Sequence, residues 1–144
     1  MQMVFGHDAV VWDWAGKNFT DYFDPSKVMP TWAVGIINDQ GVLRGALIGE
    51  EESPSTVEFT IYSEGAVTLP IARQFFTLVF DRYWRLQVRT TKDNKSVKRN
   101  APKWGFTFEG TAKDFWGPGK SALLYRMLKP DCRFLKMDRT HEIA

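Results

Sequence analysis

Three side chains in this sequence carry groups that could move a proton. Glu58 lies within residues 56–63, where apolar and polar residues alternate, so it shares the polar side of a predicted strand with Tyr62. A half-buried carboxyl group has a raised pKa, which suits a general base. Tyr62 and Tyr125 each offer a hydroxyl that can donate a proton. The same residue types also fit a wet strand face for Glu58 and simple packing for both tyrosines.

A second set of side chains could hold an anion. Between residues 82 and 103 the sequence has eight basic residues and one acid. A surface of one charge sign concentrates ligands of the opposite sign. Lys95, Lys98 and Arg99 share one side of a predicted short helix that follows Asn94. That side could meet phosphate groups. A solvated face and RNA binding are the alternatives, although no RNP-type aromatic motif favours RNA.

The composition bounds the kind of protein. Its 144 residues suffice for one domain, and 44% hydrophobic and 15% aromatic residues can fill a core. Cys132 is the single cysteine, and His7 and His141 lie at opposite ends, so we predict no disulfide within the chain and no metal, with only a carboxylate site left open. A net charge of +2 does not by itself indicate nucleic acid. No segment is apolar over the roughly 20 residues that span a bilayer, so we expect a soluble cytoplasmic protein.

The order of the predicted elements indicates how these side chains are placed. The sequence first predicts a helix at 9–15 with Asp8 as its N-cap and a helical turn near 21–23. A hairpin of strands 31–37 and 42–50 follows, with an acidic tip at 50–52 and a further strand at 56–63. The second half holds a helix at 69–84 capped by Thr68, a strand at 85–91, the basic helix from Asn94 to Gly105, a strand from 106 to 109 and a last strand near 125–128. Such an order fits an α/β (α+β) chain, in which a mixed twisted sheet carries helices on both faces.

The stretch from Asn94 to Gly110 has a recognisable pattern. Asn94, Gly105, Phe106, Glu109 and Gly110 are spaced roughly as in N-x-x-S-x-x-x-x-x-x-x-G-F-x-x-E-G. This pattern, together with the sequence YRML at 125–128, resembles the GCN5-related N-acetyltransferase (GNAT) superfamily, and most closely its branch that acetylates protein N-termini. The chain's opening and its residues 131–135 resemble GNAT-like proteins carried by bacteriophages.

The resemblance implies a single GNAT-like domain over residues 1–144. Residues 1–30 would form an abbreviated N-terminal helical region, 56–128 the cofactor-binding core and 131–144 a C-terminal tail. In the family two central parallel strands splay apart and acetyl-CoA enters between them, which implies that residues 57–63 and 86–91 form these strands.

The resemblance also implies a site for acetyl-CoA. Asn94 falls where family members hydrogen-bond the pantetheine arm, although it is equally suited to capping the helix. Ser63 ends the strand at the position of the thioester. Gly65 and Arg73 lie where the family holds the pyrophosphate, and Lys98 and Arg99 are candidates for further phosphate contacts.

Two departures from the family pattern leave a second function open. Only Gly65 remains of the family's glycine-rich loop, with Glu64 beside it and Pro70 in the following helix, and Val97 replaces the serine of N-x-x-S. The first hypothesis is an N-acetyltransferase that transfers acetyl from acetyl-CoA to an amine, with a protein or peptide as a candidate acceptor. The alternative is a catalytically degenerate GNAT-fold phage protein with a structural or partner-binding role. It would act in the host cytoplasm or the virion, as a homo-oligomer or on a phage or host protein.

Overall fold

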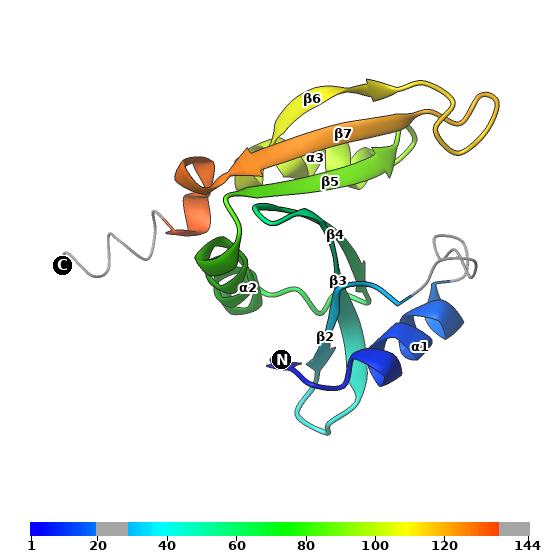
Figure 1. The fold of residues 1–144 in the computed structure, drawn as a ribbon. Coiled ribbons are helices and arrows are strands. Elements are labelled where there is room, and N and C mark those ends of the chain that lie inside the picture. The colour runs from blue at the N-terminus through cyan, green and yellow to red at the C-terminus, as the bar shows by residue number, and fades with distance from the viewer. Residues whose placement is uncertain (20–28, 136–144) are drawn as a thin grey trace. The chain divides into compact units, whose positions relative to one another are not determined.

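The computed structural model describes residues 1–19 and 29–135 (Figure 1). The predicted turn at 21–23 and the last nine residues of the expected tail, including His141, lie outside this range. The elements in chain order are β1 (Gln2–Val4), α1 (Asp8–Asn18), β2 (Trp32–Ile37), β3 (Leu43–Ser53), β4 (Thr56–Ser63), α2 (Leu69–Arg82), β5 (Arg85–Thr91), α3 (Lys95–Trp104), β6 (Thr107–Ala112), β7 (Ala122–Leu128) and the 3-10 turn η1 (Lys129–Asp131). Every strand and helix predicted within the described residues is present, so the α+β prediction is confirmed.

The described strands form one mixed sheet in the order β1-β2-β3-β4-β5-β7-β6. The chain divides into two compact units, which we describe separately. The first unit holds residues 1–51 and 59–74, and the second holds residues 52–58 and those from 75 onward. Among the described residues, none of the helices is long and apolar enough to cross a membrane.

The first unit is built on the predicted hairpin of β2 and β3. Its turn is closed by Asn38, whose side-chain oxygen accepts hydrogen bonds from the backbone N–H groups of Gln40 and Val42, both at 3.0 Å. Gly41 adopts φ +74°, which glycine does without steric cost. The unit's core joins both strands to α1 through the buried side chains of Val11, Ala15, Ala33, Ala46, Ile48 and Tyr62.

The start of α1 differs from its prediction. Asp8 is the first residue of the helix, and His7 takes the N-cap position. The Asp8 carboxylate instead accepts a hydrogen bond from the backbone N–H of Ala33 at 2.9 Å, which ties the helix to β2. Asp8 as an N-cap was therefore wrong, because a partner distant in sequence takes the carboxylate that would otherwise cap the helix.

The helix predicted at 69–84 is present as α2, which ends at Arg82. The Thr68 hydroxyl accepts a hydrogen bond from the Ile71 N–H at 3.4 Å, as expected of a cap. All six apolar positions at helical spacing are buried: Ala72, Phe75, Phe76, Val79, Phe80 and Tyr83.

The second unit contains the first three residues of β4 together with strands β5, β7 and β6. Strand β4 pairs in parallel with β5 over Thr56–Glu58 and Arg85–Gln87, whereas β5 and β7 pair antiparallel along their whole length. Phe76 centres the aromatic core, stacked on Phe134 with ring centroids 4.8 Å apart. Of the segment expected as a tail, residues 131–135 are described, and Cys132 and Phe134 are buried. This part of the segment therefore packs within the unit.

Candidate active site

Glu58 lies on β4 opposite Gln87 of β5. The Gln87 side-chain amide donates a hydrogen bond to Glu58 Oε1 at 2.9 Å, and the Arg89 guanidinium lies 3.2 Å from the same oxygen. Only 11% of the Glu58 side chain is exposed. The carboxylate is therefore held in a defined position. The alternative interpretation of the sequence, in which Glu58 lies on a wet strand face, does not apply.

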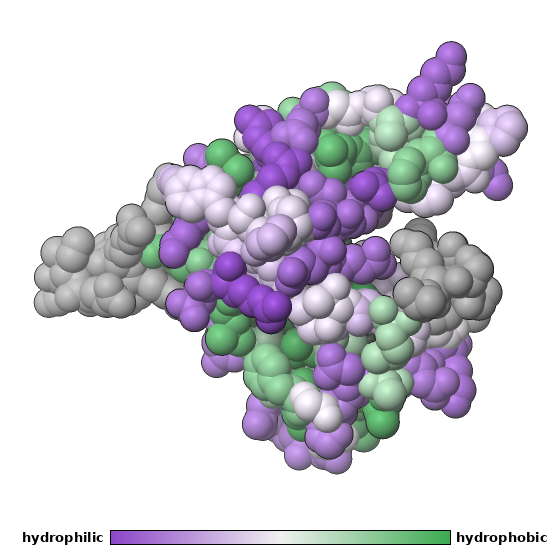
Figure 2. Space-filling model, viewed as in Figure 1, coloured by the Kyte–Doolittle hydropathy of each residue, from purple (hydrophilic) through white to green (hydrophobic). Residues whose placement is uncertain are grey.

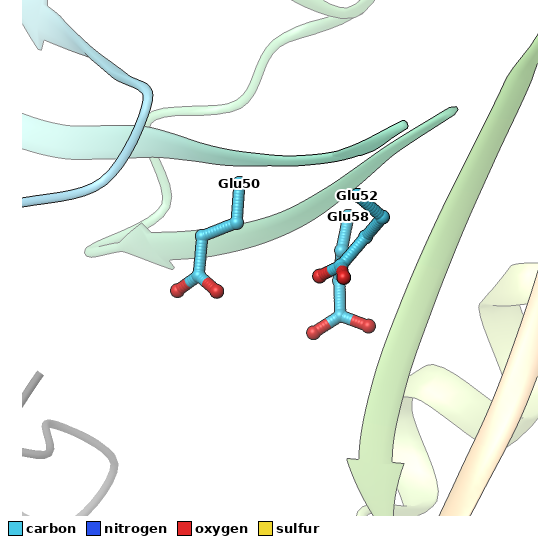
Figure 3. A group of neighbouring side chains, drawn as sticks. All are labelled: Glu50, Glu52 and Glu58. Atoms are coloured by element: carbon cyan, nitrogen blue, oxygen red, sulfur yellow. The ribbon is translucent and has the colours of Figure 1, made fainter. Parts of the chain in front are cut away.

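A second carboxylate lies close to Glu58. Figure 3 shows Glu52, from the end of β3, beside Glu58, and their carboxylate oxygens lie within 4.8 Å of each other. Glu50 lies two residues before Glu52, so it extends from the same side of that strand. Carboxylates can hold hard cations, but exposed acidic groups are common without one, and Arg89 already supplies positive charge at Glu58. We therefore keep the prediction that there is no metal site.

Glu58 is one end of a line of polar contacts across the sheet. Gln87 Oε1 accepts hydrogen bonds from Arg85 Nε and Nη2 at 3.4 and 3.3 Å. Arg85 in turn forms a two-pronged ion pair with Glu109, with Nη1 2.9 Å from Oε2. Arg126 also reaches Glu109 Oε2 at 3.4 Å. These groups share one face of the second unit's sheet.

The ion pair at Glu109 changes the titration of both partners. Hydrogen bonds from Arg85 lower the pKa of Glu109 below its usual range, and the charges of Arg85 and Arg126 act in the same direction. The pKa of Arg85 is raised, chiefly by the same hydrogen bonds. Both groups are therefore ionised at neutral pH.

The contacts of Arg85, Gln87 and Arg89 were not predicted from the sequence. Their alternation with Leu86, Val88 and Thr90 was the available signal, because alternate residues of a strand share one face. Their partners lie on other strands, and a single sequence does not name them.

Arg89 also contacts an aromatic ring. Its guanidinium carbon lies 4.3 Å from the centroid of Phe115, in the loop between β6 and β7, which is a cation–π geometry. The Phe115 ring meets Trp116 edge to face at 5.2 Å. Both rings are partly exposed, at 46% and 43%. Figure 2 shows strongly hydrophilic atoms beside hydrophobic ones at the end of the view where this loop lies.

Asn94 caps α3, as expected from the sequence. Its Oδ1 accepts a hydrogen bond from the Val97 N–H at 3.2 Å, and its Nδ2 donates one to the Thr90 hydroxyl at 3.0 Å. Lys95, Lys98 and Arg99, which were predicted to share one side of this helix, are all exposed, whereas Ala101 is buried. A contact of Asn94 with a cofactor stays a prediction.

Four predicted site residues belong to the first unit. The Ser63 hydroxyl accepts a hydrogen bond from the Ala66 N–H at 2.8 Å, and Gly65 adopts φ +75°, so residues 63–66 form an ordered turn before α2. Arg73 lies on the second turn of that helix. Glu64 lies 3.5 Å from Arg44, so its charge is partly offset. The fourth residue, Tyr62, belongs to the buried core.

The two tyrosines differ in their surroundings. Tyr62 is 7% exposed, and its ring lies 5.4 Å from that of Phe19. Burial raises the pKa of Tyr62, and the charge of Glu50 adds to the increase. Tyr125 is 6% exposed and meets the exposed ring of Phe108 at 5.5 Å.

The second unit does not bring Tyr125 and Glu58 together. Tyr125 pairs with Val88, and Glu58 pairs with Gln87, the neighbouring residue on β5. Because successive residues of a strand face opposite sides, Tyr125 and Glu58 lie on opposite faces of the sheet. The unit does bring Glu58 together with Gln87 and Arg89, which the sequence had not singled out.

Solved structures of known proteins share this fold, although no family model and no curated protein matches the sequence. A GCN5-related N-acetyltransferase from Brucella melitensis matches with a TM-score of 0.60 and 21% identity, over 81% of this chain and 58% of that one. This chain thus spans less than two thirds of the Brucella protein. The spermidine/spermine N-acetyltransferase SpeG from Vibrio cholerae, in mutant forms, matches with a TM-score of 0.73 and 12% identity, over 94% of this chain and 98% of that one.

An aminoglycoside 6'-N-acetyltransferase, solved with coenzyme A, matches with a TM-score of 0.67 and 11% identity, over 89% of this chain and 97% of that one. At such identities the likeness concerns the fold. The chain therefore has the fold of the GCN5-related N-acetyltransferases.

Proposed function

We propose that the chain is an N-acetyltransferase that takes acetyl-CoA as its donor substrate and a primary amine as its acceptor, with Glu58 as general base. The Glu58 carboxylate supports this role most directly, because it is nearly buried and is held by contacts with Gln87 and Arg89. A neutral amine nitrogen attacks the thioester carbonyl, the carbon–sulfur bond breaks, and the thiolate leaves. Glu58 accepts the proton that the amine loses, and the thiolate recovers a proton from a donor, for which Tyr62 is the candidate, because Tyr125 lies on the sheet face opposite Glu58.

The residues that would hold acetyl-CoA are those the family resemblance indicated. The exposed side chains of Lys98 and Arg99 offer positive charge for phosphate groups. The Asn94 amide offers a donor and an acceptor for the pantetheine amides. Ser63, Gly65 and Arg73, around the start of α2, complete the proposed set. A peptide N-terminus is the acceptor to test first, because the pattern from Asn94 to Gly110 resembles the branch that acetylates protein N-termini.

The proposal is tested by calorimetric titration with acetyl-CoA, followed by transfer assays on a peptide series. We expect micromolar binding. Glu58→Gln should lower kcat by about 100-fold, because general base catalysis contributes roughly that much or more, with little change in the dissociation constant of acetyl-CoA. Glu51→Gln is the matched control, since Glu51 is an exposed glutamate on β3, next in sequence to Glu52. An absence of binding at millimolar acetyl-CoA would refute the proposal.

A second candidate function is partner binding without catalysis, as in a phage-encoded GNAT-fold protein. Four exposed aromatic side chains among the described residues of the second unit favour it: Trp84, Phe108, Phe115 and Trp116. Exposed aromatic residues are frequent anchors at protein interfaces. This function would be supported by a stable complex with a phage or host protein together with an absence of acetyl-CoA binding.

A further inference from the structure

Arg89 contacts Glu58 on one side and an aromatic ring on the other. Its Nη2 lies 3.2 Å from Glu58 Oε1, and its guanidinium carbon lies 4.3 Å from the centre of the Phe115 ring. Arg89 is 26% exposed, so water only partly screens its charge. We infer that Arg89, held in place by Phe115, is a positioning residue that sets the orientation and the charge state of Glu58. This inference rests on the proposed role of Glu58 as the base.

The groups around Glu58 show why Arg89 matters. Glu52, from β3, places a second carboxylate within 4.8 Å, and Glu50 lies two residues earlier on the same side of that strand. Negative charge at this distance disfavours ionisation of Glu58, whereas the positive charge of Arg89 favours it. Gln87 donates a hydrogen bond to the charged form but carries no charge itself.

The other arginines of this face have different partners. Arg85 reaches Gln87, but its guanidinium forms the two-pronged pair with Glu109. Arg126 is also paired with Glu109. Of these three described arginines, Arg89 is the one whose guanidinium lies against Glu58, and it opposes the nearby carboxylates of β3.

Hydrogen bonds within the loop between β6 and β7 order the backbone beside Phe115. Asp114 adopts φ +54°, and its backbone N–H donates to the Ser121 hydroxyl at 3.1 Å. The Asp114 carboxylate accepts a hydrogen bond from the Gly119 N–H at 3.0 Å. The contact with the ring restricts the conformations open to the long Arg89 side chain, so less entropy is lost when Arg89 pairs with Glu58.

The test is a direct titration of the Glu58 carboxyl carbon by NMR in the full chain, with Glu58→Gln used to assign the signal. In Arg89→Met we expect the titration midpoint of Glu58 to move to higher pH by about one unit or more, because an ion pair at this distance shifts a carboxyl by that much. Arg89→Lys should restore part of the shift, since lysine keeps the charge but lacks the planar fork. In Glu52→Gln the midpoint should move to lower pH.

The aromatic support is tested separately. Phe115→Leu should move the Glu58 midpoint in the same direction as Arg89→Met, but less, because it leaves the charge and removes only the ring. Phe108→Leu is the matched control and should leave the midpoint unchanged, because Phe108 is also exposed but its ring meets Tyr125, on the sheet face opposite Glu58. If Arg89→Met fails to fold, the Glu58 midpoints of Phe115→Leu and Arg89→Lys decide the test. An unchanged midpoint in every variant that folds overturns the inference.

The same variants separate this inference from the proposed function. If the chain transfers acetyl groups, the acidic limb of its pH profile for kcat/KM should move to higher pH in Arg89→Met, in step with the NMR midpoint. A shifted midpoint in a chain without transferase activity would uphold the pairing of Arg89 with Glu58 and overturn the proposed function. The remaining outcome is an active transferase in which Arg89→Met changes neither the acidic limb of the kcat/KM profile nor the NMR midpoint of Glu58. That result would overturn the inference about Arg89 and leave the proposed function standing.

Discussion

Gly105 and Asp131 approach each other so closely that no side chain fits between them. A Cβ atom on residue 105 would lie 2.5 Å from the Asp131 carbonyl oxygen, a separation that real Cβ atoms do not show. Gly105 also adopts φ +109° where α3 ends, and its N–H is directed to the carbonyl groups of Ala101 and Pro102. Two independent constraints therefore require glycine at this position.

Replacing this glycine should destabilise the protein. We expect Gly105→Ala to lower the free energy of unfolding by about 2 kcal/mol or more, because the left-handed backbone and the close carbonyl each oppose a side chain. Urea unfolding measures the effect. Gly110→Ala is the control, since a Cβ there would meet open space and the backbone is not left-handed. Equal losses in the two variants would contradict the explanation.

The two roles of Asn94 can be separated by substitution. Asn94→Ala should cost about 1 kcal/mol of stability, because it removes the acceptor that caps α3. Asn94→Ser keeps a capping oxygen but loses the amide. If Asn94 contacts acetyl-CoA, calorimetry should show weaker acetyl-CoA binding in both variants, although Asn94→Ser, which loses only the hydrogen bond to Thr90, should be destabilised less than Asn94→Ala.

A control for Asn94 lies on the same helix. Asn100 is hydrogen-bonded to Ser96 at 3.3 Å on the exposed side of α3, so Asn100→Ala should change neither stability nor binding appreciably. Full acetyl-CoA affinity in Asn94→Ser would leave Asn94 with the capping role alone.

The elements of this fold could be predicted because their signals are local. The spacing of apolar residues in α2 and the Asn38 turn between β2 and β3 depend on neighbours within a few residues. The glycine that ends α3 was also predicted, because a helix end favours glycine. Its contact with Asp131 was not, since that contact depends on how a distant segment packs.

The candidate site could be predicted only in part, for the same reason. Glu58 stood out as a carboxylate inside an alternating strand, but its partners lie on β5 and β3, which the chain reaches through turns and a helix. Asp8 shows how a local signal can mislead. Its residue type favours an N-cap, but in the structure its carboxylate accepts a hydrogen bond from the Ala33 N–H, 25 residues away in the sequence. Side-chain partners across strands follow from register, which a single sequence does not fix.

The ion pairs of Glu109 should make stability depend on pH in a defined direction. The pKa of Glu109 is lowered in the folded state, so the stabilisation is complete above the pKa of the unfolded chain and is lost as the pH falls through the lowered value. Because a third of the Glu109 side chain is exposed, we expect Glu109→Gln to cost no more than about 1 kcal/mol at neutral pH. Urea unfolding at pH 7 and near pH 3 should show this difference shrinking in acid.

Salt and a second glutamate provide the controls for Glu109. High salt should reduce the neutral-pH difference, because the pair is partly exposed. Glu64→Gln should cost less, since Glu64 and Arg44 are each more than 40% exposed and lie 3.5 Å apart. A cost of Glu109→Gln that is the same at both pH values would show that the ion pairs are not its cause.

Tyr62 should titrate above the ordinary range of tyrosine. Burial raises its pKa, and the charge of Glu50 adds to the increase. The absorbance change of the wild type minus that of Tyr62→Phe, followed through alkaline pH, isolates this residue from the other three tyrosines. The unfolded chain ionises first, at about pH 10, so the contribution of Tyr62 to stability is complete below that pH and is lost as the pH rises toward the higher folded value. Glu50→Gln should lower the midpoint only slightly, because burial is the larger cause. A Tyr62 that titrates in the ordinary range would contradict its burial in the core of the first unit.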